Sequence, residues 1–224
     1  TEAQVAETTG DLLKWKRPVT VGIYARPGEV ELKIMAKASS GAAALKAANR
    51  IETTIRTRFK EKVFGIDEET LSSAVGMLLR KKKQTVAGAE SCTGGLLSGL
   101  LTETAGSSDY FLGGTITYDN RIQSSVLGID PKEIARYGAV SPAIAKQMAR
   151  NVRHILGSNY GISITGIAGP SGGTRQKPVG LVYIAIADSK SIQCVQSLFH
   201  GNRSEIRSRA VQRALDLLRL RLLN

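Results

Sequence analysis

Two short segments near the N-terminus alternate apolar and polar side chains, which is the pattern of a half-buried β-strand. They are Val19–Ile23 and Val30–Ile34, and the run Arg26-Pro27-Gly28 between them has the composition of a turn. On either side, Ala3–Lys14 and Ala42–Phe59 are predicted as helices, the second because apolar residues recur in it at helical spacing. The pattern therefore predicts a small α+β domain, a hairpin between two helices, in residues 1–65.

After the joint at Phe64-Gly65-Ile66, strand and helix patterns alternate to the end of the chain, which is typical of an α/β domain. We predict this domain over residues 66–224. Its first helix is expected to be N-capped by Asp67, with Glu68 and Glu69 in the first turn and Arg80–Lys83 in the last. The strands expected are Thr85–Ala89, Gly113–Tyr118, Gly161–Thr165, Gly180–Ala187 and Ile192–Phe199, and the further helices are Gly94–Thr104, Pro142–Leu156 and Arg203–Leu222.

Charge adds one question to this picture. The 31 basic and 19 acidic residues give a net charge of +12, which is compatible with an anionic partner. The basic residues are nevertheless spread over several segments without interleaved aromatic residues, which favours solvated helix faces. The first 65 residues also lack the Gly-x-x-Gly loop of an RNA-binding KH module, so nucleic acid is not an expected partner.

Compartment and cofactors follow from a few residue types. The apolar runs are too short to cross a bilayer, and the polar, acidic first ten residues do not form a signal peptide. Cys92 and Cys194 lie in unrelated contexts and predict no disulfide, so a cytoplasmic protein is expected. His154 and His200 stand alone, and neither a metal nor another cofactor is expected.

The first candidate for chemistry is the segment from Ala89 to Gly95, where an apolar strand runs into small hydroxyl residues and two glycines. A serine at such a turn can act as a nucleophile beside unpaired backbone N–H groups that would hold an oxyanion. The same residues also suit an ordinary helix N-cap. Spacing alone favours the ordinary turn, because this is not the nucleophile elbow of α/β-hydrolases.

Two further segments could bind an anion. The loop from Thr165 to Thr174 is rich in glycine, which lets backbone amides approach a phosphate, although a long surface loop has the same composition. Arg203 and Arg207 are four residues apart, so they share a face of the last helix. Cations oppose the dipole at a helix N-terminus, which hints at an anionic ligand, and two exposed arginines are the equal alternative.

Taken together, these segments resemble the CinA family. The motifs that carry the resemblance are AESCTGG (89–95), TYDN (117–120), GAVS (138–141), SITGIAGPSGGT (163–174), KPVG (177–180) and GNR (201–203). They occur in the order typical of that family's C-terminal amidohydrolase domain and cover nearly all of residues 68–224. The upstream segment resembles the KH-like domain that precedes this module. The resemblance therefore implies an α/β amidohydrolase domain behind a small α+β domain.

The resemblance implies hydrolysis of the carboxamide of nicotinamide mononucleotide to nicotinate mononucleotide and ammonia, in pyridine nucleotide salvage, by a homodimer. Ser91 would be the nucleophile, with Tyr118 as the active-site tyrosine and with Cys92 only a small buried residue. The substrate would contact Glu90, Thr93, Gly94, Gly95, Thr165, Gly166, Gly169, Gly172, Gly173, Lys177, Arg203 and Arg207. The N–H groups around Thr93 to Gly95 would hold the oxyanion, and the glycine-rich loop and the arginines would hold the phosphate.

One position departs from the family pattern. The family has Tyr-x-Asn-x-x-Lys, where the lysine accepts the proton of the nucleophile, and Gln123 occupies that lysine position here. An amide does not accept a proton at neutral pH, and neither does the guanidinium of Arg121. The chain is then either a slow amidohydrolase in which Tyr118 or Lys177 takes over as the base, or a nucleotide-binding or scaffold protein of the same fold. Asn202, where the family has Asp, is a milder change.

Overall fold

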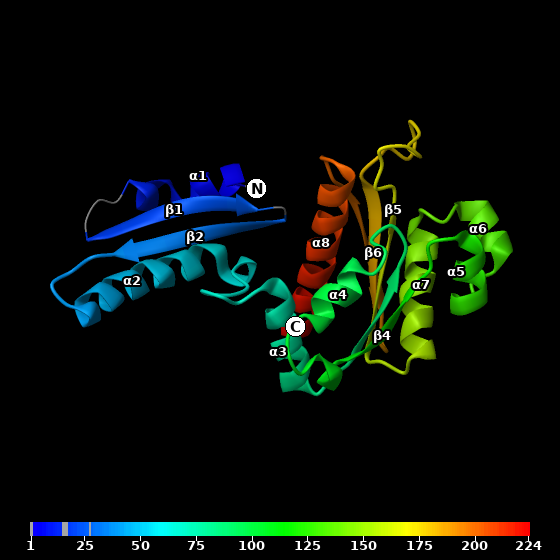
Figure 1. Cartoon of the computed structure of the whole chain (residues 1–224), viewed down its shortest axis with the longest axis horizontal. Coiled ribbons are helices and arrows are strands. Elements are labelled where there is room, and N and C mark those ends of the chain that lie inside the picture. Colours follow the sequence, from blue (N-terminus) through cyan, green and yellow to red (C-terminus); the bar gives the residue numbers. More distant parts are fainter. Residues whose placement is uncertain (1, 15–17, 27) are drawn as a thin grey trace. The chain divides into compact units, whose positions relative to one another are not determined.

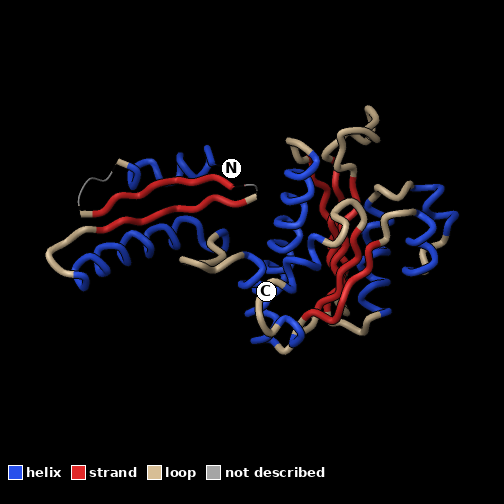
Figure 2. The backbone as a smooth tube through the Cα atoms, viewed as in Figure 1, coloured by secondary structure: helices blue, strands red, loops and turns tan. Residues whose placement is uncertain are grey.

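The computed structural model describes residues 2–14, 18–26 and 28–224. It contains two compact units, residues 1–64 and residues 65–224. The division lies one residue before the boundary expected from the sequence. Each unit has its own sheet, of two strands and of five strands. Figure 2 shows the strands of both sheets with their helices.

The N-terminal unit is a hairpin between two helices, as the alternating pattern predicts. Its elements are α1 (Glu2–Leu13), β1 (Val19–Arg26), β2 (Glu29–Ala36), α2 (Gly41–Phe59) and the short 3-10 helix η1 (Lys60–Lys62). The strands pair antiparallel, from Val19 opposite Ala36 to Arg26 opposite Glu29. Leu12, Val21 and Ile51 belong to one core that joins both helices to the hairpin. Pro27, in the predicted turn, lies outside the described residues.

The C-terminal unit carries a mixed sheet in the order β4-β3-β5-β6-β7. Its elements are α3 (Leu71–Lys82), β3 (Val86–Glu90), α4 (Leu96–Thr102), η2 (Ser107–Asp109), β4 (Phe111–Ile116), α5 (Asn120–Leu127), α6 (Pro131–Tyr137), α7 (Pro142–Ile155), β5 (Tyr160–Gly166), β6 (Leu181–Ala187), β7 (Ile192–Leu198) and α8 (Arg203–Leu223). The central strands β3 and β5 are buried along almost their whole length. This matches their continuous apolar and small-residue sequences.

Strand direction brings the candidate segments to one edge of this sheet. The strands β4, β3 and β5 are parallel, and Glu90 at the end of β3 pairs with both Ile116 and Ile164. The turns that follow these three strands therefore emerge side by side, where open α/β sheets bind ligands. Because β6 runs antiparallel to β5 and β7 to β6, the end of β7 and the start of α8 return to the same edge.

Helices cover both faces of the five-stranded sheet. On one face, α7 contacts β3, β5, β6 and β7, and α5 and α6 pack on α7. On the other face, α8 contacts β5 and β6, and α3 and α4 pack against α8. Figure 1 shows the sheet between these two layers. Buried residues of α8 such as Val211, Leu215 and Leu218 form the center of the second layer.

The structure differs from the sequence prediction at several element ends. Asp67 does not cap α3, because it has a positive φ of 51°. Thr70 is the N-cap, in a reciprocal capping box with Ser73, so the acidic residues 68 and 69 precede the helix instead of opening it. The prediction also missed α5 and α6, which are seven to eight residues long and have little room for a periodic pattern.

No helix in the described ranges is both long and apolar enough to cross a membrane.

An ion pair closes the far end of this unit, and it generates a pH prediction. Asp188 accepts hydrogen bonds from Arg221 Nε at 2.9 Å and from the N–H groups of Lys190 and Ser191. Burial raises the pKa of Asp188, but these donors outweigh it and the net pKa is lowered. A lowered pKa stabilises the fold above the unfolded-state value of about 4, and this contribution is lost as the pH falls through the folded-state value.

We expect Asp188→Asn to lower the free energy of unfolding by about 1 kcal/mol at pH 7, because Arg221 is partly exposed and water screens the pair. The difference from the natural chain is expected to shrink as the pH falls below about 4. Urea denaturation at pH 7, 4 and 3 measures it. A difference that stays constant over this range would contradict the assignment.

Candidate active site

The turn after β3 is built around the buried carboxylate of Glu90. This side chain has no exposed surface, and its oxygens accept hydrogen bonds from the N–H groups of Gly95, Leu97 and Ser98 at 2.8–3.1 Å. The Ser98 hydroxyl donates a fourth, at 2.7 Å. A buried carboxylate needs such donors to offset its desolvation. The structure thus gives Glu90 a role in shaping the turn, and its predicted contact with a substrate stays a prediction.

The hydrogen bonds within this turn determine which of its N–H groups remain unpaired. Gly94 N–H donates to the Ser91 carbonyl and Gly95 N–H to Glu90, so neither is open to a ligand. The N–H groups of Cys92 and Thr93 have no acceptor in another described residue. They are the groups able to stabilise an oxyanion beside Ser91. The sequence predicted this role for the N–H groups from Thr93 to Gly95, whereas the structure leaves those of Cys92 and Thr93.

Ser91 and Cys92 differ sharply in their surroundings. Ser91 is half-buried, and its hydroxyl makes no hydrogen bond within the described part of the chain. Cys92 is buried, and burial raises the pKa of its thiol to about 12 although Arg207 and Arg203 lie near enough to oppose the shift. At neutral pH Cys92 is therefore a neutral thiol and not the reactive thiolate. The accessible nucleophile of this turn is the Ser91 hydroxyl.

Tyr118 follows β4 and lies at the same sheet edge. Its phenol oxygen accepts a hydrogen bond of 2.8 Å from Nη2 of Arg203, and Nη1 of Arg203 donates to the Gly169 carbonyl at 2.7 Å. Arg121, which the sequence placed beside Tyr118, instead pairs with Asp119. The cation that touches Tyr118 comes from α8. Asn202 caps α8 through Glu205 N–H, a role that Asn and Asp perform equally well.

Arg207, one turn along α8, reaches the serine turn. Its Nη2 donates to the Thr93 carbonyl at 2.6 Å, and its Nε is buried without a partner. Neither Arg203 nor Arg207 has a carboxylate partner among the described residues. Two uncompensated guanidinium groups at one edge make this region attractive to an anion.

Lys177 is engaged by two backbone carbonyls. Its Nζ donates to the carbonyls of Tyr137 at 3.1 Å and Val140 at 2.8 Å, in the turn between α6 and α7. Gly138 in that turn has a φ of 77°, and a Cβ there would lie 2.8 Å from the amine. Thr165 also ties this turn down, because its hydroxyl donates to the Ala139 carbonyl. Both residues therefore anchor loops in the structure, and the substrate contacts that the resemblance implies for them stay predictions.

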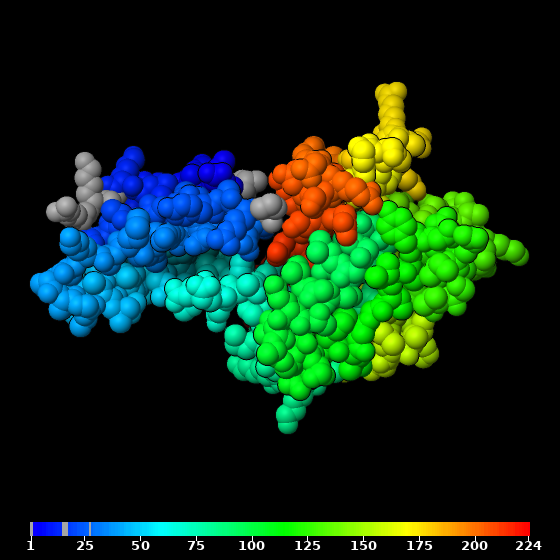
Figure 3. Space-filling view, viewed as in Figure 1, coloured from blue at the N-terminus to red at the C-terminus, as the bar shows by residue number. Residues whose placement is uncertain are grey.

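The glycine-rich loop after β5 folds back on its own outgoing arm. Gly169 has a φ of 75°, and a Cβ at this residue would lie 2.5 Å from Val179. Gly166 and Gly173 face residues 178–182 just as closely, whereas Gly172 is exposed. Close packing of the two arms accounts for three of these four glycines. In Figure 3 this loop (yellow) stands beside the start of α8 (orange).

Gln123 is fully buried in the first turns of α5. Its Nε2 donates a long hydrogen bond of 3.4 Å to the Thr117 carbonyl, and its Oε1 has no partner among the described residues. The hydroxyl of Thr117 is also buried and unpaired. An orphaned acceptor of this kind is costly and uncommon. Thr117 N–H donates to the Glu90 carbonyl, so this poorly satisfied spot adjoins the serine turn.

Sequence reasoning missed several residues that shape the site. Ser98 and Thr117 act through contacts between segments, and no spacing along the chain indicates them.

No group of three or more His, Cys, Asp or Glu residues that could hold a metal occurs in the part of the chain that the structure describes.

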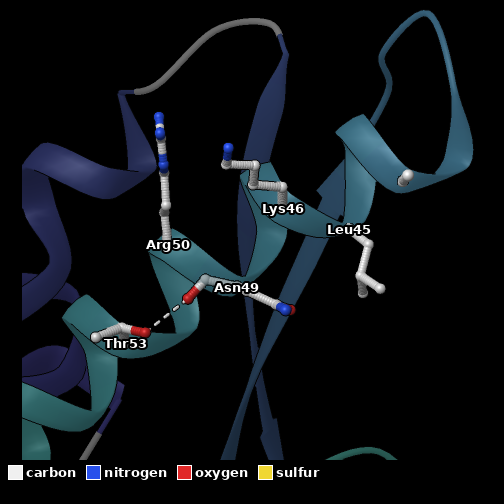
Figure 4. A pocket seen from close by; sticks show the side chains of 6 residues that line it. Leu45, Lys46, Asn49, Arg50 and Thr53 are labelled. Carbon is white, nitrogen blue, oxygen red and sulfur yellow. Dashed lines mark hydrogen bonds between the residues drawn. The ribbon is translucent and has the colours of Figure 1, made fainter.

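A shallow pocket in the N-terminal unit contains none of the predicted site residues. It lies on the exposed side of α2, where Lys46 and Arg50 are one helical turn apart (Figure 4). Its other lining residues are Ala42, Leu45, Asn49 and Thr53. That this unit does not bind nucleic acid stays a prediction.

Both units match known protein families. Residues 68–222 match the family model described as the CinA C-terminal domain, and residues 1–65 match the damage-inducible protein CinA KH domain. The chain belongs to the CinA family. A CinA-like protein from Gloeothece citriformis is 47% identical over 99% of this chain and 54% of its own length. This chain thus spans about half the length of the curated CinA relatives it matches.

Solved structures agree with this assignment. A competence/damage inducible protein from Agrobacterium tumefaciens is 36% identical with a TM-score of 0.68, over 72% of this chain and 99% of its own. A CinA superfamily protein from Klebsiella pneumoniae is 29% identical with a TM-score of 0.66, over 68% of this chain and 96% of its own. The CinA resemblance and the fold class predicted from the sequence, an α/β domain behind a small KH-like α+β domain, are confirmed.

The contacts of Glu90 yield a stability prediction. In Glu90→Gln an amide NH₂ faces backbone N–H donors, so at least one buried donor loses its acceptor, at a cost of about 3 kcal/mol. We expect the urea midpoint of the C-terminal unit to fall accordingly. Glu103→Gln, an exposed substitution next to the end of α4, is the matched control and should leave the midpoint unchanged. Equal midpoints for Glu90→Gln and the natural chain would show that the carboxylate is dispensable.

Proposed function

We propose that the C-terminal domain hydrolyses the carboxamide of nicotinamide mononucleotide, giving nicotinate mononucleotide and ammonia. The observation that carries the proposal is the Ser91 hydroxyl beside the N–H groups of Cys92 and Thr93, none of which has a hydrogen-bond partner in another described residue. Arg207 contacts the same turn through the Thr93 carbonyl, and neither it nor Arg203 pairs with a carboxylate among those residues. Membership of the CinA family supports the same reaction through the resemblance described above. A homodimer and a cytoplasmic location remain predictions.

The chemistry divides into two steps. Ser91 Oγ attacks the amide carbon, and the oxyanion that forms accepts hydrogen bonds from the N–H groups of Cys92 and Thr93. The C–N bond then breaks, and the amide nitrogen takes up a proton and leaves as ammonia. The acyl group stays on Ser91 as an ester. Water attacks this ester, releases the carboxylate and restores the hydroxyl.

The arginines suit the remainder of this substrate. The 5′-phosphate of nicotinamide mononucleotide is an anion, and guanidinium groups form strong charge-assisted hydrogen bonds with phosphate oxygens. Arg207 is the better placed of the two, because a single contact with the Thr93 carbonyl leaves most of its donors free. Lys177 and Glu90, whose polar atoms are engaged by the protein, are not needed for binding in this proposal.

Proton transfer is the weak point of the site. Lys177 is occupied by two carbonyls, and Glu90 is buried and saturated. Gln123 has no titratable nitrogen. The proton of Ser91 must therefore pass to water, and because general-base help is worth about 10²–10⁴ in rate, we propose that turnover is slow.

The nucleophile can be identified by paired substitutions. We expect ammonia release from nicotinamide mononucleotide to stop in Ser91→Ala and to persist within about threefold in Cys92→Ala, because a thiol with a pKa of about 12 contributes no thiolate. A coupled ammonia assay at about neutral pH follows both variants. Ammonia release that survives Ser91→Ala would reject the mechanism, and none from the natural chain after prolonged incubation would reject the function.

Gln123→Lys is expected to increase kcat by at least about tenfold. A lysine of similar length can donate to the Thr117 carbonyl and leaves no orphaned acceptor, and burial lowers the pKa of its amine toward neutrality. Activity of this variant should therefore rise with pH as the amine loses its proton.

Gln123→Met is the control for that substitution, since methionine has a similar side-chain length but, unlike lysine, carries no titratable group. Thermal denaturation of both variants verifies that they fold. A folded Gln123→Lys protein with the turnover of the natural chain would show that the base is supplied elsewhere.

A further inference from the structure

Arg203 joins two loops of the site through the two ends of its guanidinium. Nη1 donates to the Gly169 carbonyl at 2.7 Å and Nη2 to the Tyr118 phenol oxygen at 2.8 Å. Gly169 lies in the loop after β5, and Tyr118 lies in the turn after β4. One side chain from α8 thus bridges segments that follow two different strands.

Tyr118 depends on this contact for its orientation. The residue is 58% exposed, and its phenol makes no other hydrogen bond within the described part of the chain. Because Arg203 donates to the phenol oxygen, the O–H proton of Tyr118 must point elsewhere, and it is free to donate to a bound molecule. Among the described residues, Arg203 is thus the hydrogen-bond partner that fixes the position of this phenol.

Arg207 differs from Arg203 although both lie on one face of α8. Arg207 uses one nitrogen on the Thr93 carbonyl, whereas both terminal nitrogens of Arg203 are occupied by protein acceptors. From the sequence, the two arginines were predicted to be equivalent phosphate ligands. Their contacts indicate separate roles.

We propose that Arg203 is a positioning residue, which directs the Tyr118 hydroxyl toward the substrate carboxamide and holds the glycine-rich loop, while Arg207 provides the anion contact. This inference rests on the proposed amidohydrolase function. We expect lysine to be a poor replacement for Arg203, because Gly169 and Tyr118 are contacted by two separate nitrogens of a rigid planar fork, which a single ammonium on a flexible stem does not reproduce. Charge alone is therefore insufficient at this position.

The first test is a double-mutant cycle on nicotinamide mononucleotide hydrolysis with Arg203→Lys, Tyr118→Phe and the double variant. Each single substitution should lower kcat about 10- to 100-fold, as expected for a lost charge-assisted hydrogen bond, with KM changed less than about threefold. The double variant should be no more than about threefold slower than Tyr118→Phe. Arg213→Lys, on the same helix but paired with Asp216, is the control and should match the natural chain.

Two results would overturn the proposal. Multiplying effects in the double variant would show that Arg203 acts independently of Tyr118. A rise in KM for nicotinamide mononucleotide that is absent with nicotinamide riboside, which lacks the phosphate, would make Arg203 the phosphate ligand.

A second measurement needs no substrate and separates this inference from the proposed function. Hydrogen exchange of residues 167–175 should be faster in Arg203→Lys than in the natural chain and unchanged in Arg213→Lys. Faster exchange in a chain that releases no ammonia would reject the amidohydrolase proposal and support the loop contact of Arg203. Unchanged exchange would overturn the positioning role, even if the natural chain hydrolyses nicotinamide mononucleotide.

Discussion

The candidate site depends on a carboxylate that never meets solvent. Glu90 ends a buried strand and accepts hydrogen bonds from three backbone N–H groups and one hydroxyl at the start of α4. A charge buried in this way is tolerated because the donors and the positive end of the helix compensate it. As a consequence, the amides of Gly95, Leu97 and Ser98 are engaged by Glu90, and the half-buried Ser91 lies in the turn that connects the strand to them.

Around this turn, loops are held by three cations that form no ion pair with another described residue. Lys177 fastens the turn at residues 137–140, Arg203 fastens Tyr118 and Gly169, and Arg207 fastens Thr93. Neutral carbonyls satisfy the hydrogen-bonding capacity of these groups but do not cancel their charge. The site is thereby ordered before any ligand arrives and retains a positive potential, a combination that reduces the entropic cost of binding an anion.

Gln123 is the point at which local chemistry and family pattern disagree. The C-terminal unit keeps the fold of the CinA family, and Thr117, whose carbonyl accepts a hydrogen bond from Gln123, donates its own N–H to the Glu90 carbonyl at the end of β3. Two buried polar atoms at this position, Oε1 of Gln123 and the hydroxyl of Thr117, have no hydrogen-bond partner among the described residues. A fold is determined by many contacts and tolerates one poor contact, whereas proton transfer depends on a single group. Membership of the CinA family therefore predicts the fold of this chain better than it predicts its reaction rate.

Hydrophobic periodicity along the chain was enough to predict the hairpin unit, the α/β unit and most of their strands, because burial repeats every two residues in β1 and β2 and continuously in β3 and β5. Ordered motifs identified the family, and they brought Ser91, Tyr118 and Arg203 to attention. Which hydrogen bonds these residues form was decided only in three dimensions. Lys177 and Thr165 donate to carbonyls that lie 26 to 40 residues away along the chain. Glu90 accepts from the first turn of α4. Arg203 donates to Tyr118, which is 85 residues away. Partners so distant along the chain are set by the packing of whole elements, and no local pattern records them.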